Sequence, residues 1–172
     1  MWTWTGRARP PFAVKPGPDQ ESVWDYPRPP RLASDPRRVT VHAGNARIAD
    51  TTRAVRVLET ASPPTFYLPP QDIDLDRLHP APGSSRCEWK GRAVYWSVRD
   101  DDDHWLEAAS WSYPEPTAAF AAIAGWLSFY PARLRCTVDG EPVRPQPGGF
   151  YGGWLTDEIV GPVKGSPGTG HW

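Results

Sequence analysis

Short apolar segments, separated by proline, glycine and polar residues, follow one another along most of the chain. They alternate or form brief apolar runs, which is typical of β-strands rather than of long helices. The segments with this pattern are 38–50, 53–60, 65–70, 91–98, 105–113 and 134–143. The 22 prolines and 15 glycines are spread over the whole length and leave little room for long helices. We therefore predict a mainly β fold: a compact antiparallel two-sheet or tent/half-barrel-like domain with one or two short helices.

Turn signals join several of these segments into hairpins. Gly44-Asn45 and Asp139-Gly140 have the residue types that favour tight hairpin turns. The polar run "RDDDDH" (99–104) separates two aromatic strands and predicts the best hairpin of the chain. Only two segments have helical spacing. These are "QDIDLDRLH" (71–79) and "TAAFAAIAGW" (117–126), each long enough for one or two turns that would cover a sheet.

The two ends of the chain differ from its middle. They are rich in proline and glycine, yet 21–30 and 150–160 contain Trp24, Tyr26 and Tyr151, whereas disordered segments are usually poor in aromatic residues. We therefore expect a single β domain over 21–160 that includes these docked extensions. Residues 1–20 and 161–172 are expected to be flexible tails.

Composition excludes several classes of partner. The formal net charge is −1 and the pI about 6.4, so no basic field for nucleic acid is present. No stretch approaches the roughly 18 apolar residues of a membrane span, and the N-terminus lacks the apolar core of a signal peptide. Cys87 and Cys136 are expected to be free thiols. We expect a cytoplasmic protein with no nucleic-acid or membrane partner and no cofactor.

The order of several motifs resembles a known family. "RIADTTRAVRVLET", "FYLPPQDI", "CEWKGRAVYW", "AASWSYPEP" and "WLSFYP" succeed one another as in the bacterial and fungal family catalogued as domain of unknown function 427. The resemblance covers roughly Arg38 to Val143. It implies a compact, mostly β fold, related to tent-like two-sheet folds, and no established activity.

Some catalogues label this family as a nucleotidyltransferase, and the residues give that label little support. Nucleotidyl transfer of the common type uses a Gly-Ser turn followed closely by an Asp-x-Asp pair that holds Mg²⁺. Here a whole predicted strand separates Gly83-Ser84 from Asp101 and Asp103. A solvated hairpin turn explains these aspartates better, and we predict no metal site.

Cys87 and Lys90 are the residues whose chemistry is most open. A nucleophilic cysteine needs a neighbouring cation and usually a histidine, and no histidine is near Cys87 in sequence, so a small buried residue is favoured. Zinc would need further Cys or His ligands. Lys90 could snorkel to solvent, pair with Glu59 or Glu107, or anchor a ligand.

Strand geometry decides between these alternatives. A straight strand over 87–98 would place Cys87 and Lys90 on opposite faces, whereas a bend at Gly91 could bring them to one side. In the following hairpin, pairing Val98 with Trp105 would set Lys90 opposite Tyr113 and Arg92 opposite Trp111. A slip by one residue would set Ala93 opposite Trp111 instead.

These observations favour a small-molecule cleft near the "CEWKG" and "WSYP" motifs. Its candidate ligand-binding residues are Lys90, Tyr95, Trp111 and Tyr113, with Glu59, Tyr67 and Cys87 nearby. Whether the cleft also catalyses a reaction is left open, and no catalytic residue is assigned. The alternative is a protein-interaction or self-association module, a homodimer for example, that uses the aromatic, Pro/Gly-rich extensions.

Overall fold

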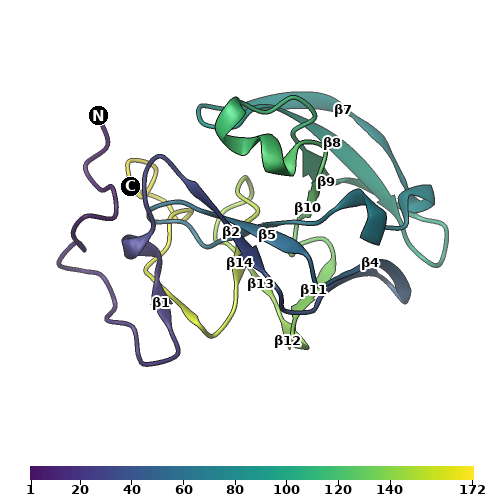
Figure 1. Cartoon of the computed structure of the whole chain (residues 1–172). Helices are drawn as coiled ribbons and strands as arrows, with labels where there is room; N and C mark the ends of the chain where they lie inside the picture. The colour runs from purple at the N-terminus through teal and green to yellow at the C-terminus, as the bar shows by residue number, and fades with distance from the viewer.

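The computed structural model describes all 172 residues, and strands dominate it, as the sequence pattern predicts (Figure 1). Two larger antiparallel sheets have the strand orders β10-β9-β8-β7 and β12-β11-β3-β4, and a third, antiparallel, has the order β2-β5-β6. None closes into a barrel. The strands of these sheets are β2 (Arg31–Asp35), β3 (Val39–Ala43), β4 (Ala46–Thr51), β5 (Ala54–Leu58), β6 (Thr65–Tyr67), β7 (Leu78–Cys87), β8 (Gly91–Arg99), β9 (Trp105–Ser112), β10 (Leu127–Phe129), β11 (Arg135–Val138) and β12 (Glu141–Pro142).

Two small strand pairs belong to the extensions. The parallel pair joins β1 (Glu21–Ser22) to β15 (Ile159–Val160), and the antiparallel pair joins β13 (Arg144–Pro145) to β14 (Trp154–Leu155). The parallel pair brings together segments about 140 residues apart in the chain, so both extensions meet on one side of the domain (Figure 1).

Leu68 and Leu127 connect the three-stranded sheet to the β7–β10 sheet. The Leu68 backbone N–H donates to the Leu127 carbonyl at 2.8 Å, and the Leu127 N–H donates to the Leu68 carbonyl at 3.0 Å. The strands β2-β5-β6 and β10-β9-β8-β7 therefore form one curved wall. Tyr67 at the end of β6 and Trp111 in β9 become neighbours on it.

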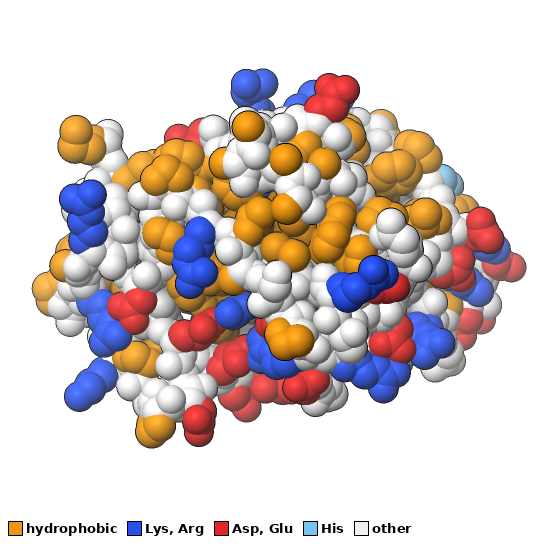
Figure 2. Space-filling view, viewed as in Figure 1, with side chains coloured by type: hydrophobic (Ala, Val, Ile, Leu, Met, Phe, Trp, Pro, Cys, Tyr) orange, Lys and Arg blue, Asp and Glu red, His pale blue; other side chains and the backbone are white.

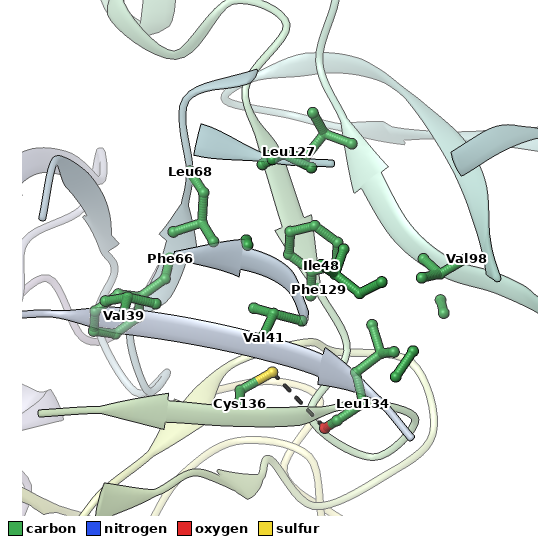
Figure 3. Packing of buried hydrophobic residues seen from close by; sticks show 14 of the residues in the cluster. Val39, Val41, Ile48, Phe66, Leu68, Val98, Leu127, Phe129, Leu134 and Cys136 are labelled. Atoms are coloured by element: carbon green, nitrogen blue, oxygen red, sulfur yellow. Dashed lines mark hydrogen bonds between the residues drawn. The ribbon is translucent and has the colours of Figure 1, made fainter. Parts of the chain in front are cut away.

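The main core lies between this wall and the β3-β4-β11 sheet (Figure 3). Alternate residues of β3 point into it, as the period of two requires. Trp154, from the C-terminal extension, stacks on Phe66 with ring centroids 4.7 Å apart and donates its indole N–H to the Phe129 carbonyl at 2.9 Å. The labelled core residues of Figure 3 are Val39, Val41, Ile48, Phe66, Leu68, Val98, Leu127, Phe129, Leu134 and Cys136.

The predicted hairpins at Gly44-Asn45, at 99–104 and at Asp139-Gly140 are confirmed, and the helical segments are shorter than predicted. The segment 71–79 contains only the 3₁₀ turns η2 (Pro70–Asp72) and η3 (Leu75–Arg77), after the 3₁₀ turn η1 (Val23–Asp25) in the extension. The segment 117–126 forms η4 (Ala118–Ile123), which is 3₁₀ and kinked at Phe120. The structure contains no helix of the length and hydropathy needed to cross a membrane.

The strand β7 was not predicted, because Pro80, Pro82 and Gly83 lie within it. It is an edge strand with a register shift between Ala81 and Ser84, which is where a sheet tolerates proline. The predicted helix over 71–79 was therefore wrong at its end, since Leu78 and His79 already pair with β8.

Aromatic residues from both ends of the chain pack together beside β1. The rings of Trp4 and Phe12 make edge contacts with Trp24, and Phe12 stacks on Trp172 at 5.2 Å. The buried Arg28 donates to the carbonyls of Trp4 and Trp172 at 3.2 and 2.9 Å. The segments expected to be flexible tails thus contribute side chains to an aromatic cluster, because several large rings can bury area together.

A partly buried ion network fastens the extensions to β5. Arg56 of β5 pairs with Glu21 of β1 and lies 3.4 Å from Asp35 of β2, while Arg37 bridges Asp35 and Glu158 at 2.7 Å each. Burial opposes ionisation of Glu21 and Asp35, but hydrogen bonds from the arginines outweigh it. The pKa of each of these two carboxyls is therefore below its ordinary value.

This network predicts a component of acid sensitivity. Because the folded-state pKa of Asp35 is lowered, its stabilisation is complete above the unfolded-state pKa of about 4 and is lost as the pH falls through the folded value. Asp35→Asn should lower the free energy of unfolding at neutral pH by about 1.5–3 kcal/mol and flatten its decline below about pH 4. Urea unfolding between neutral and acidic pH measures both effects. The exposed Asp102→Asn is the control, and an unchanged pH profile in Asp35→Asn would contradict the argument.

Candidate functional site

A cavity of about 250 Å³ opens on one face of the curved wall. Figure 2 shows apolar side chains gathered across the middle of the visible face, with many charged side chains along its lower rim. All seven candidate residues from the sequence line the cavity: Glu59, Tyr67, Cys87, Lys90, Tyr95, Trp111 and Tyr113. The residues that sequence reasoning grouped therefore line one cavity, while ligand binding by them stays a prediction.

Strand register explains why side chains from five strands meet here. Tyr95 of β8 is directly opposite Trp111 of β9, and Ser85 of β7 is opposite Ala93 of β8. Val57 of β5, opposite Thr65, lines the same cavity. Because strand side chains alternate between faces, these rows project to one side of the wall, and the main core packs largely against the other.

Of the two registers considered for the β8–β9 hairpin, the one slipped by a residue holds only next to the turn, where Val98 is opposite Leu106. Further along, Trp111 is opposite Tyr95, not Arg92 or Ala93, since the register shifts between Trp96 and Val98. Two extra residues in β9 accompany the shift, since three residues of β9 lie opposite Ser97 alone. Among them Ala108 adopts φ 50°, and its N–H donates to the Ser97 hydroxyl at 3.2 Å. Alanine rarely adopts this left-handed conformation, so the sequence pattern gave no signal for the bulge.

A tight turn brings Cys87 and Lys90 to the same cavity. Strand β7 ends at Cys87 and β8 begins at Gly91, directly opposite it, so Glu88, Trp89 and Lys90 form the turn. The straight strand considered over 87–98 does not exist, and Gly91, with φ 100°, is where the chain reverses. Thr117 holds the turn, because its hydroxyl donates to the Trp89 carbonyl at 2.7 Å and its N–H to the Lys90 carbonyl at 3.1 Å.

Lys90 is a buried cation without a carboxylate partner. Only 7% of the residue is exposed, and its ammonium forms no ion pair within 4.0 Å. It lies 5.4 Å from the centroid of the Tyr113 ring and 6.0 Å from that of Phe120. Burial by itself lowers the pKa of Lys90, but its interactions with Tyr67, Cys87 and Glu59 outweigh burial and raise that pKa. Lys90 is thus a cation at neutral pH.

The predicted pairing of Lys90 with Glu59 or Glu107 is not formed. The Glu59 carboxylate accepts hydrogen bonds from the Arg28 guanidinium and the Trp89 indole, each at 3.2 Å. Glu107 is exposed on β9 and does not line the cavity. Snorkelling is also excluded, since Lys90 is enclosed. Of the three roles considered for Lys90, ligand anchoring is the one that stays a prediction.

Phenol and indole groups form the floor beside Lys90. The Trp111 indole donates to the Tyr67 hydroxyl at 3.1 Å, and the Tyr67 and Tyr113 ring centroids are 6.3 Å apart. Burial raises the pKa of Tyr67 and of Tyr113 above the ordinary phenol value. Both phenols are therefore neutral at physiological pH and form no ion pair with Lys90.

The extensions complete the cavity, which sequence reasoning missed. Their lining residues are Trp2, Gln146, Phe150, Tyr151, Gly152 and Lys164. Lys164 is buried and lies 5.1 Å from the Trp2 ring and 5.5 Å from the Tyr151 ring, so it holds these aromatics together. The aromatic content of "GGFYGGW" predicted docking, but no local pattern indicates on which face a Gly-rich segment docks.

The acidic turn between β8 and β9 uses its carboxylates internally. Asp100 accepts from the N–H groups of Asp102 and His104, Asp101 from that of Asn45, and Asp103 from the Arg99 guanidinium. No three His, Cys, Asp or Glu side chains converge in a geometry that could hold a metal ion. These aspartates stabilise the turn and the neighbouring β3–β4 hairpin.

The sequence of the chain matches one known protein family. The profile described as "Domain of unknown function (DUF427)" matches residues 31–140, which is more than half of the chain and close to the 38–143 expected from the motifs. The chain belongs to this family. No curated protein matches it. The family segment contains β2 to β11 and therefore Lys90 and the floor of the cavity, whereas the extensions of this member lie outside it.

Gly152 tests how tightly the extension closes on the floor. A Cβ at this position would lie 2.2 Å from Cη2 of Trp111, so Gly152→Ala must displace that ring or the extension. We expect the free energy of unfolding to fall by about 1–3 kcal/mol, the range for overpacking. Gly149→Ala is the matched control, because its Cβ would meet no atom within 4 Å. Equal stability of the two variants in urea unfolding would show that residue 152 does not pack on the floor.

Proposed function

We propose that this DUF427 member binds a small organic anion with a flat, unsaturated body in the main cavity. The observation that carries the proposal is the enclosed Lys90 ammonium, which faces open volume and has no carboxylate partner. Isolated buried charge is unfavourable by several kcal/mol, so proteins usually pair it or remove it. An anionic ligand would supply the missing partner.

The surrounding side chains support this class of ligand. Glu59 is the acidic lining residue that could compete with an anionic ligand for Lys90. It is already paired with Arg28, whose side chain is only 2% exposed. Glu88, the other acidic lining residue, is exposed at the rim. The rings of Tyr67, Trp111 and Tyr113 offer edges and faces against which a planar group packs.

Replacing Lys90 should separate function from stability. Lys90→Met keeps the length of the side chain and removes the charge, so the ligand-free variant should unfold with a free energy equal to wild type or up to about 3 kcal/mol higher. Binding of benzoate, naphthoate or biphenyl monocarboxylate should weaken at least about tenfold, the loss expected for one charge-assisted hydrogen bond. Calorimetric titration and thermal unfolding measure the two quantities.

The controls for this experiment are a second lysine and a neutral ligand. Lys15→Met removes an exposed charge outside the cavity and should bind like wild type. The matching neutral carboxamides should bind weakly to every variant. Equal affinity of wild type and Lys90→Met for the carboxylates would overturn the proposal.

Cys87 reports where such a ligand sits. This thiol is half-buried and lines the cavity, whereas Cys136 is enclosed in the main core, where burial raises its pKa. A carboxylate at ten times its Kd should slow alkylation of Cys87 by iodoacetamide about tenfold, because only unliganded protein reacts. Mass spectrometry of tryptic peptides follows both cysteines, and Cys136 should stay unmodified throughout. Binding without protection of Cys87 would place the ligand elsewhere.

A further inference from the structure

A second cavity lies directly beside the first. It has a volume of about 240 Å³ and shares four lining residues with the main cavity: Tyr95, Tyr130, Gln146 and Tyr151. The main cavity is about the same size, and each alone is smaller than the roughly 300–1,000 Å³ of sites for drug-sized ligands. The two together fall within that range.

The side chains between the cavities differ in how firmly they are held. Gln146 is fixed at both ends of its amide, since it donates to the Lys164 carbonyl at 2.7 Å and accepts from Gly153 N–H at 3.1 Å. Tyr130 packs on Trp111 with centroids 4.5 Å apart. Tyr151, in contrast, is 40% exposed and lies in the irregular segment before Gly152. Of these shared lining residues, Tyr151 is thus the one held least firmly.

Arg133 gives the second cavity its own cation. Its side chain is exposed and forms no ion pair, and its one hydrogen bond goes from Nη1 to the Glu107 carbonyl at 2.8 Å. No acidic residue lines this cavity. The remaining guanidinium N–H groups are therefore free for a carboxylate or phosphate, which they can bind in a bidentate manner.

We propose that the two cavities form one elongated site for a molecule with an anionic group at each end, one at Lys90 and the other at Arg133, and with a flat middle beside Tyr95 and Tyr130. This inference rests on the proposed function and adds the length and charge of the ligand to it. Tyr95 lies four residues along β8 from Gly91, which is about 13 Å of extended strand.

Matched acids of increasing length test the proposal. The probes are the monocarboxylates of benzene, naphthalene and biphenyl and the dicarboxylates that carry their two carboxylates at opposite ends of the same ring systems. They are titrated by calorimetry into the full-length protein. A diacid long enough to reach Arg133 should bind about tenfold more tightly than its monoacid, and Arg133→Ala should abolish this advantage without changing monoacid affinity. Arg92→Ala, which removes an exposed arginine of β8 that lines neither cavity, should leave both affinities unchanged.

The outcomes distinguish this inference from the function on which it rests. Monoacid binding that depends on Lys90, combined with no gain for any diacid or with a gain that survives Arg133→Ala, would overturn the elongated site and leave the proposed function standing. Absence of binding that depends on Lys90, for every acid of the series, would overturn both. A gain that appears only for the longer diacids and disappears in Arg133→Ala supports both.

Discussion

Two backbone hydrogen bonds between Leu68 and Leu127 hold together the wall on which the cavity lies. They join β6 to β10, and only through this joint does Tyr67 reach Trp111, whose indole donates to its hydroxyl at 3.1 Å. Both leucine side chains are buried in the main core on the other face of the wall. Burial of a leucine contributes about 1.5–3 kcal/mol, more than a typical net hydrogen bond, so core packing keeps the joint closed. The cavity on one face therefore depends on hydrophobic packing on the other.

Lys90 is a buried cation for which the fold supplies no carboxylate partner. Elsewhere such pairs form, as Glu21 and Asp35 do with the partly buried Arg56. Glu59 could have neutralised Lys90, yet it accepts from Arg28 and Trp89. A chain selected only for stability would gain from pairing Lys90 or replacing it by an apolar residue. Retaining an unpaired cation that faces a cavity is consistent with a binding role, because departures from local consistency gather at functional sites.

Local sequence patterns predicted the hairpins, which depend on neighbouring residues. They failed for the strand register and for the docking of the extensions, which depend on distant segments. Period-two alternation and turn residues located the hairpins. Alternation alone would separate Lys90 from Tyr95, and the two line one cavity because the chain turns before Gly91. The register of β8 and β9 could not follow from pattern, because it turns on a left-handed alanine, Ala108. Strand β7 was hidden by prolines that only an edge position permits. The contributions of Gln146, Tyr151 and Lys164 depend on long-range docking, for which a Gly-rich segment carries no periodic signal.

The cavity is lined partly by the family segment and partly by the extensions that lie outside it. Lys90, Tyr67, Trp111 and Tyr113 all lie within the matched residues 31–140, so the cation and its aromatic floor belong to the shared domain. Gln146, Tyr151 and Gly152 lie beyond it and form the side of the cavity opposite that floor. Gly152 packs so closely on Trp111 that an added Cβ would lie 2.2 Å from the ring, so the extension sets how much space remains beside the floor. Variation in the extension can therefore alter the size of the ligand that fits while the family segment stays unchanged.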